Sequence, residues 1–500
     1  MKPFRLPLVG PYISRVSSPS TASGIVGVGV VGLMVVGQSS SSTTKDARYI
    51  NVYSQTVPDP LTGGKRVYAV KRPGFATHTT PASGQKGYDV HVWVGEASGT
   101  KVISAFGETT STIYDGTTSL GAITGRATGI TETFVGTTPT LVVSSTDNTA
   151  WYYDTGVGVM TRITDADFPG NAGKTLAGTF SHIDGYATIM DTEGVVWASD
   201  LNTLTGWTAT SFDSANAYPD KGVGGVRHRQ FIMAFGTESV QFFYNAGLTP
   251  FPLSKATAMT QKVGAVHADA IAQIADTTFW CGSTAQGGLS IFQYDGDLTR
   301  ISTPEIDATL VLSGATTISL SPIRFAGRSF ILVRAGSLTI AYCVEEKFWH
   351  EWTSTTPLWY RCAALTNIGG SMVNYAVSNV ATGGKVYVMN QADPVFTDDG
   401  NAYTATIQLP LQDLGTKRRK FWHEIELVGD EEESASTVTL GYTDDDYQNT
   451  TTHGSSDLSN DRVRFTRLGS SQRRGWRITH AANTPMRLEA LEGNVTVGSS

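Results

Sequence analysis

One hairpin pattern recurs along this 500-residue chain: an apolar strand, a turn, and a second strand that closes on an aromatic residue. The clearest copy is HRQFIMAFGTESVQFFYNAG, at residues 228–247. The intervals between successive closing aromatics run from 39 residues (Tyr114 to Tyr153) to 51 residues (Phe243 to Tyr294). Strand–turn–strand units of this length are typical of β-propeller blades. The full set of closing aromatics is Tyr114, Tyr153, Trp197, Phe243, Tyr294, Tyr342 and Tyr387.

A four-stranded sheet cannot bury both of its faces alone, so blades stack on one another and close into a ring that leaves no long exposed edge. Only 16% of the residues are charged and 53 are glycine, which favours short strands and tight turns over helices. The sequence therefore predicts an all-β protein with a β-propeller of five to seven blades over residues 85–402. Evenly spaced strands of stacked β-sandwiches would give a similar spacing and remain an alternative. A short helix is expected only as an insertion, at residues 266–275.

The flanks of the propeller have a different composition. Residues 403–500 alternate apolar and polar residues between polar turns, which predicts a separate antiparallel module of five or six strands. Residues 46–84 are expected to hold the strands that lead into the propeller, and residues 1–45 an N-terminal extension. Within that extension, residues 24–37 are apolar but shorter than the roughly 20 residues of a membrane helix. We interpret them as a β segment or a subunit-packing segment, without stable membrane insertion.

The charge of the chain is mildly acidic, with 37 basic against 44 acidic residues and a net charge of −7. This argues against a protein whose main role is to bind phosphate backbones tightly. Charges concentrate near the C-terminus, as KRRK at residues 417–420, DEEE at 430–433 and DDD at 444–446. These runs are either solvated surface or oppositely charged patches that meet across subunits. The candidate partner-binding residues are Lys417, Arg418, Arg419, Lys420, Arg473 and Arg474.

No motif in the sequence predicts catalysis or a metal site. GNAGKT at residues 170–175 resembles the end of a phosphate-binding loop, but the first glycine of that motif would fall at Phe168. The His-Glu pairs at 350–351 and 423–424 do not continue to HExxH. The stretches at 144–151 and 190–197 only faintly resemble the Asp-box turns of sialidases, with Thr192 where the second should have aspartate. The chain is thus predicted not to be an enzyme and to need no cofactor.

The three cysteines, Cys281, Cys343 and Cys362, are too few for a disulfide framework or a four-ligand zinc site. We expect three buried thiols that act as small apolar side chains. A single bridge between Cys343 and Cys362 stays open at this stage.

Several stretches resemble a known family, the packaged-DNA-stabilising tail proteins of short-tailed phages. DARYINVYSQ (46–55) followed by VYAVKRPGF (67–75) is similar to the opening of these proteins, although Ser54 stands where proline is frequent. The segments at 220–247 and 260–296 resemble the central blades, through the core FGTESVQFF and the aromatic strands around it. FTRLGSSQRRGWRI (465–478) is similar to a basic, aromatic strand near the family's end.

The resemblance implies a virion protein, the hub or nozzle of the tail, which is assembled in the host cytoplasm. In that family, six copies form a ring below the portal and adaptor proteins, and tail fibre, tailspike or tail needle proteins are further partners. The ring surrounds the channel through which the DNA leaves, and it helps to retain the packaged DNA without sequence-specific binding. Two alternatives remain: a propeller that binds or hydrolyses host-surface carbohydrate, and a monomeric ligand-binding propeller.

Overall fold

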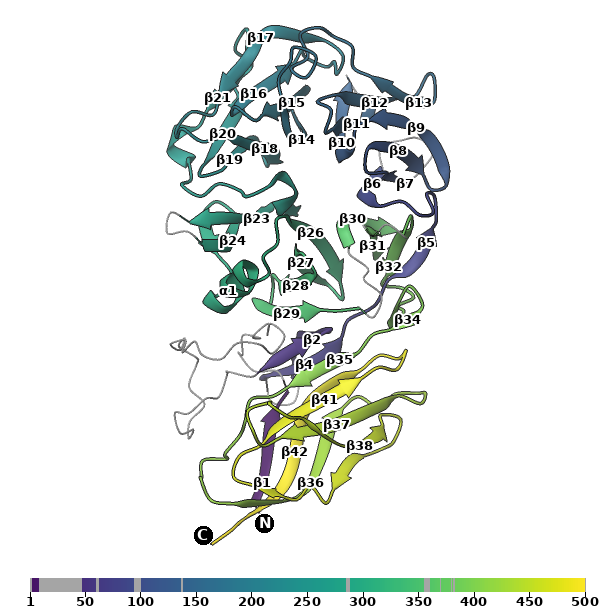
Figure 1. The fold of residues 1–500 in the computed structure, drawn as a ribbon, viewed down its shortest axis with the longest axis vertical. Coiled ribbons are helices and arrows are strands. Elements are labelled where there is room, and N and C mark those ends of the chain that lie inside the picture. The colour runs from purple at the N-terminus through teal and green to yellow at the C-terminus, as the bar shows by residue number, and fades with distance from the viewer. Residues whose placement is uncertain are drawn as a thin grey trace. The chain divides into compact units, whose positions relative to one another are not determined.

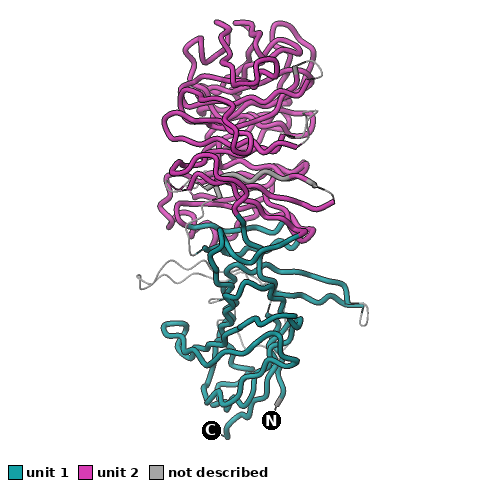
Figure 2. Tube along the Cα trace, turned by 90° about the vertical axis from the view of Figure 1, so that its right-hand side faces the viewer, with its two compact units in different colours: residues 1–76, 338–356, 393–500 teal, residues 77–337, 357–392 magenta. Residues whose placement is uncertain are grey.

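A computed structural model of the chain describes most of the sequence, and its compact parts form two units. Unit 1 comprises residues 1–76, 338–356 and 393–500, and unit 2 comprises residues 77–337 and 357–392 (Figure 2). The apolar stretch at residues 24–37, which we interpreted as a β segment or a subunit-packing segment, lies outside the described residues. The described residues are 2–8, 47–59, 63–93, 100–135, 138–284, 288–354, 360–368, 370–378, 380 and 383–499.

Unit 2 is a β-propeller, which confirms the predicted fold class. Six four-stranded antiparallel sheets follow one another around a ring, and the hairpin β26–β27 lies between the fifth and the sixth (Figure 1). Six blades fall within the predicted range of five to seven.

Five of the blades are each built from four strands that are consecutive in the chain, and every strand pairs with the next one. Their strands are β6 (Gly87–Trp93), β7 (Lys101–Phe106), β8 (Thr110–Asp115), β9 (Thr118–Thr124), β10 (Ala127–Val135), β11 (Thr138–Ser145), β12 (Ala150–Asp154), β13 (Val159–Arg162), β14 (Leu176–Ile183), β15 (Tyr186–Asp191), β16 (Val195–Ser199), β17 (Trp207–Ser214), β18 (Gly222–His228), β19 (Phe231–Gly236), β20 (Val240–Asn245), β21 (Leu253–Lys255), β22 (Ile271–Ile274), β23 (Thr277–Thr284), β24 (Gly288–Tyr294) and β25 (Leu298–Arg300).

The sixth blade closes the ring with a strand from much earlier in the chain. Its sheet order is β30 (Tyr360–Ile368), β31 (Ser371–Ser378), β32 (Val386–Asn390) and β5 (Ala76–Thr79). His78 of β5 packs edge-on against Tyr375 of β31, with 5.1 Å between ring centroids. The hairpin beside this blade is β26 (Ile318–Phe325) with β27 (Arg328–Ala335). A late blade completed by an early strand holds a ring closed without a covalent link.

The recurring aromatic residues occupy equivalent places in the blades. In all six blades the predicted residue lies on the third strand, and Tyr342 lies on β28 (Leu338–Cys343) of unit 1. Their side chains contribute to the packing between blades. Phe242, which precedes the predicted Phe243, packs against Tyr294 of the next blade at 5.1 Å, and Phe235 meets Trp280 at 5.3 Å. The strands are Tyr114 on β8, Tyr153 on β12, Trp197 on β16, Phe243 on β20, Tyr294 on β24 and Tyr387 on β32.

Inner strands of neighbouring blades approach closely where both carry glycine. A Cβ on Gly178 of β14 would lie 2.9 Å from Cα of Gly224 on β18, and Gly178 has a φ of +75°. Both the close approach and the left-handed backbone require glycine.

The prediction of a helix at residues 266–275 is wrong. That stretch holds a 3₁₀ turn, Ala268–Ala270, followed by β22, because its apolar residues fill the innermost strand of a blade. The described residues instead include an α-helix at Pro304–Leu312. The Thr303 hydroxyl accepts a hydrogen bond from the Ile306 backbone N–H, and proline stands in the first turn, so this helix has an ordinary start signal.

Unit 1 contains two large sheets that share one apolar core, with Tyr49, Trp422 and Trp476 among its buried aromatics. One sheet has the order β3-β4-β42-β36-β39, to which β1 and β40 add at the side of β42 and β36. Its strands are β1 (Lys2–Pro7), β3 (Val52–Pro58), β4 (Lys65–Lys71), β36 (Lys420–Gly429), β39 (Val463–Thr466), β40 (Ser470–Ser471) and β42 (Arg487–Val497).

The other sheet of unit 1 runs β28-β29-β2-β35-β41-β37-β38, and only the pairing of β2 with β29 is parallel. The C-terminal residues thus form antiparallel strands as predicted, but eight of them, β35 to β42, instead of five or six, and they share their sheets with strands from before residue 76. Among the described residues no helix is long and apolar enough to cross a membrane. The remaining strands are β2 (Arg48–Ile50), β29 (Phe348–Trp352), β35 (Ala405–Gln408), β37 (Thr437–Thr443), β38 (Thr451–Asp457) and β41 (Gly475–His480), with the short pair β33 (Thr397–Asp398) and β34 (Asn401–Ala402).

Candidate functional site

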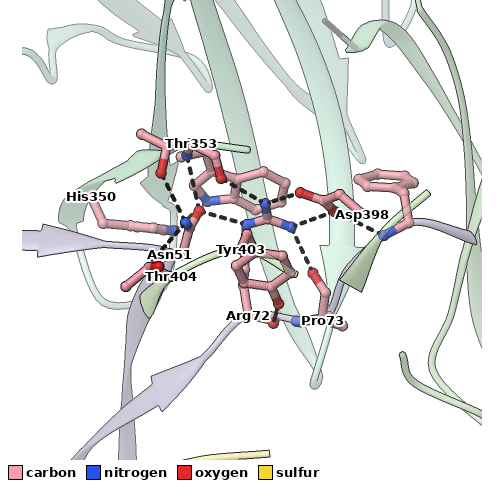
Figure 3. Close-up of polar contacts among 10 residues, drawn as sticks. Asn51, Arg72, Pro73, His350, Thr353, Asp398, Tyr403 and Thr404 are labelled. Carbon is pink, nitrogen blue, oxygen red and sulfur yellow. Dashed lines mark hydrogen bonds and ion pairs between the residues drawn. The ribbon is translucent and has the colours of Figure 1, made fainter. Parts of the chain in front are cut away.

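A cluster of buried polar groups in unit 1 surrounds Arg72, the residue that follows β4. The guanidinium is 1% exposed and forms an ion pair with Asp398 of β33, with 2.5 Å between Nη2 and Oδ2. Its Nε donates to the Asn51 side-chain oxygen at 2.9 Å, and Nη2 also donates to the Thr353 carbonyl at 3.2 Å. Figure 3 shows these partners arranged around the guanidinium. The Arg72 cluster therefore joins segments of the chain that are up to 326 residues apart.

Aromatic rings cover the two faces of this guanidinium. Its central carbon lies 4.5 Å from the centroid of the Trp352 ring and 4.1 Å from that of Tyr403. The second carboxylate oxygen of Asp398 accepts a hydrogen bond from the Phe75 backbone N–H at 3.1 Å. A buried ion pair is tolerated when further hydrogen bonds satisfy both partners in this way. This geometry indicates a structural role, in which the buried ion pair holds distant segments of unit 1 together.

Gly74 explains the Pro-Gly element of the sequence. Its N–H donates to the Val395 carbonyl at 2.6 Å, and a Cβ at this position would lie 2.0 Å from the Thr397 carbonyl oxygen. Only glycine lets the chain pass this close to the strand that carries Asp398.

Three further titratable groups are buried near the Arg72 cluster. Burial and the charge of Arg72 lower the pKa of Lys71 to about 8, and its ammonium donates to the Ala482 carbonyl at 2.6 Å. Burial and Arg72 also lower the pKa of His350 to about 3, while burial and Lys71 lower that of His480 to about 4. Both imidazoles are 1% exposed or less, so no substrate can reach them. Their shifted pKa values report burial and not catalysis.

Two of the six candidate partner-binding residues lie inside unit 1. Lys420 is 0% exposed, and its ammonium donates to the carbonyls of Thr416, Arg418 and Gln472. Arg474 is 2% exposed and forms a double hydrogen bond with Asp444, at 2.7 Å for each nitrogen. These two cations hold the loop before β36 and the loop before β41 in place.

The other four candidates reach the surface. Lys417, Arg418 and Arg419 are exposed on the loop that leads into β36, and Arg419 Nε donates to the Ser470 hydroxyl at 3.0 Å. Arg473 is also exposed but forms an ion pair with Asp446 at 2.7 Å. The surface therefore keeps a shorter basic run than the sequence indicates.

The stretches with a faint Asp-box resemblance are turns that brace blades. Asp191 is fully buried, and its carboxylate accepts hydrogen bonds from the backbone N–H groups of Glu193 and Val195 and from the Trp197 indole, at 2.9 to 3.0 Å. The residue that fills the aspartate role is thus Asp191 and not Thr192. A buried carboxylate satisfied by N–H donors has no contact to offer a sugar, so the turn is structural.

The phosphate-loop resemblance at residues 170–175 falls in a turn between β13 and β14, where no helix follows to cradle a phosphate. The His-Glu pair on β29 is split across the strand: His350 accepts from the Trp352 indole at 2.8 Å, while Glu351 pairs with Arg48 at 2.8 Å. Within the described ranges, no three His, Cys, Asp or Glu side chains are grouped closely enough to hold a metal ion.

Two of the cysteines have described thiols. Cys281 and Cys343 are both buried, and burial raises the pKa of Cys281 to about 12. The Cys343 thiol lies 3.7 Å from the Glu345 carboxylate, whereas the side chain of Cys362 lies outside the described residues.

Comparison with known proteins identifies the relatives of the chain. A model of the family described as "Bacteriophage P22 Gp10, beta-propeller" matches residues 46–383, which is 338 of the 500 residues. No curated protein matches the chain. Among solved structures, the "Crystal structure of RRP9 WD40 repeats" aligns with a TM-score of 0.41 and 8% identity, over 64% of this chain and 98% of that one.

Proposed function

Because the chain belongs to this phage-stabilisation family, and is thus a structural virion protein of a phage tail, we propose that it forms the tail hub. In this role, about six copies assemble into a ring below the portal and adaptor proteins, as the family resemblance implies. The ring retains the packaged DNA and later serves as its exit path. The observation that carries the proposal is the family match across the propeller and the strands before it.

Two properties of the chain support a structural role. The buried charged groups of Arg72, Asp398 and Asp191 are hydrogen-bonded to neighbouring protein groups, so they brace loops and blades. The net charge of −7 suits a conduit, because a mildly acidic wall repels the phosphate backbone that must pass through it. We therefore propose contact with DNA without sequence-specific binding.

The proposed partners follow from this position. Portal and adaptor proteins would bind one face of the ring, and tail fibre, tailspike or tail needle proteins would bind elsewhere on it. The exposed residues Lys417, Arg418, Arg419 and Arg473 remain our candidates for partner contacts.

The mass of the purified protein in solution tests the proposal directly. We expect native mass spectrometry to show a ring of about six copies, either alone or after mixing with a portal–adaptor assembly. A parallel test uses virions that lack the protein, which should lose their DNA after packaging. A strict monomer that ignores the adaptor, or virions that keep their DNA without it, would contradict the tail-hub role. Binding to host glycans would then favour the carbohydrate alternative.

A further inference from the structure

Strand β36 carries opposite charges at its two ends. Three basic residues, Lys417 to Arg419, immediately precede it, and the acidic residues Asp430 to Glu433 immediately follow it. A strand of ten residues spans roughly 30 Å. This is several times the Debye length of about 8 Å at physiological ionic strength, so the two ends cannot neutralise each other within one molecule.

The basic end contains more than the sequence run. Arg467 is exposed and adjoins β36, because its backbone N–H donates to the His423 carbonyl at 3.3 Å. Phe421 lies beside these charges with 46% of its surface exposed, opposite Ser470 in the sheet. We define the basic end as Lys417, Arg418, Arg419, Phe421 and Arg467.

None of the four cations of the basic end forms an ion pair with any residue that the structure describes. By contrast, the neighbouring Arg473 is paired with Asp446, and Arg464 is paired with Glu424 and Glu426. An apolar ring surrounded by unpaired cations combines a hydrophobic anchor with a charged rim, which is the composition of a protein–protein interface.

The acidic end consists of Asp430, Glu431, Glu432 and Glu433. Asp430 forms an ion pair with Arg487 at 2.7 Å, whereas Glu431 and Glu433 are exposed and have no ion pair among the described residues. Burial raises the pKa of Glu432, and the like charges of Asp430 and Glu433 raise it further. Excess negative charge is therefore crowded at this end of the strand.

We infer that the basic end of one copy of the chain binds the acidic end of the next copy. This inference rests on the ring proposed above and names its contact. The two surfaces differ and lie at opposite ends of one strand, so the contact is heterologous, and such contacts generate a closed ring when the rotation closes. Charge complementarity fixes the partner and its orientation, while Phe421 adds apolar contact at the centre.

Charge exchange between two variants tests this inference. The first variant is Lys417→Glu/Arg418→Glu/Arg419→Glu, which makes both ends acidic. The second is Glu431→Lys/Glu432→Lys/Glu433→Lys, which leaves only Asp430 acidic and makes both ends basic. We expect either variant alone to lose self-association by about tenfold or more in sedimentation velocity at low salt, since like charges then face each other. Mixing the two should restore rings in which they alternate, and native mass spectrometry would show both masses in one assembly.

A matched control changes the net charge equally at exposed lysines elsewhere: Lys65→Glu/Lys221→Glu/Lys347→Glu. This control should assemble like the wild type, and circular dichroism checks that each variant folds. The milder variant Lys417→Gln/Arg418→Gln/Arg419→Gln should weaken assembly to a smaller extent.

The possible outcomes separate this inference from the ring proposal. If the wild type forms rings and both reversals leave them intact, the contact is elsewhere and the ring proposal stands. If each reversal weakens assembly but mixing does not restore it, the basic end binds a different protein and the copy-to-copy contact is wrong. If the wild type stays monomeric even with the portal–adaptor assembly, the ring proposal fails and this inference fails with it.

Discussion

Units 1 and 2 both bury aspartate carboxylates, but they satisfy them in different ways. In unit 2, Asp191 accepts three hydrogen bonds from N–H groups within six residues of itself. In unit 1, Asp398 pairs with Arg72, a residue 326 positions earlier in the chain. Each described ion pair of unit 2 has a basic side chain at least 22% exposed, whereas Arg72 is 1% exposed.

This difference follows from how each unit is assembled. A blade forms from consecutive strands, so local turn chemistry is sufficient to fix it. Unit 1 gathers strands from three distant segments of the chain, and directional charged contacts at their meeting point select one arrangement among many. The units should therefore respond differently to mutation and to pH.

The largest expected effect is the loss of the Asp398 carboxylate. Asp398→Ala leaves the Arg72 guanidinium buried without its counter-charge, which typically costs about 3–5 kcal/mol of stability. Hydrogen exchange measured by mass spectrometry should show lost protection in β2, β4 and β35, while β15 and β19 keep theirs. The exposed Asp393→Ala serves as the control and should behave like the wild type. A loss spread equally over the blades would remove the distinction between the units.

Acidification is expected to have the next largest effect, and again mainly on unit 1. The pKa values of His350 and His480 are lowered on folding, to about 3 and about 4. Below pH 6.5 the unfolded chain therefore binds protons that the folded chain does not, so stability falls as the pH drops from about 6.5 towards 4. We expect a loss of roughly 2–4 kcal/mol at pH 5, from the free energy of about 1.4 kcal/mol per pKa unit.

Urea unfolding at pH 7.5 and pH 5 measures this loss. Because the pKa of His350 in the folded chain is about 3, its Nε2 stays unprotonated and keeps accepting from the Trp352 indole, 2.8 Å away, so the tryptophan fluorescence of the folded protein should not change between these two pH values. In His480→Gln the acid sensitivity should be smaller than in the wild type. Equal stability at both pH values would show that these imidazoles are not buried as described.

Much of unit 2 was predictable from sequence, and the reason is that its pairing is local. Six of the seven aromatic residues recur because each occupies the third strand of a blade. The centre of unit 1 was not predictable, since neither Arg72 nor Asp398 carries a signal for a partner hundreds of residues away. The inward direction of two basic residues of unit 1 was predictable, although they stand within runs of charged residues. Lys420 and Trp422 share one side of the strand alternation, as do Arg474 and Trp476, so the inward direction of both cations follows from period two.

Removal of the Asp191 carboxylate in unit 2 is expected to lower stability moderately. Asp191→Ala leaves two backbone N–H groups and the Trp197 indole without their acceptor, which should cost about 1–3 kcal/mol. The loss should be confined to β15, β16 and the turn between them. Glu193→Ala, two residues away and on the surface, should change stability by less than about 1 kcal/mol although it removes the ion pair with Lys174. If Asp191→Ala destabilised unit 1 as well, the contrast between local and long-range contacts would fail.

The smallest effect concerns the four positions of the KRRK run, which divide between surface and interior. Lys417→Gln and Arg418→Gln remove exposed charges without an ion pair among the described residues, so stability should change by less than about 0.5 kcal/mol. Lys420→Gln instead shortens a buried side chain that donates to three carbonyls, and it should lower the unfolding midpoint in urea measurably. One basic run would then contain exposed residues whose loss leaves stability unchanged and a buried lysine whose loss lowers it. Equal stability of all three variants would contradict the inward position of Lys420.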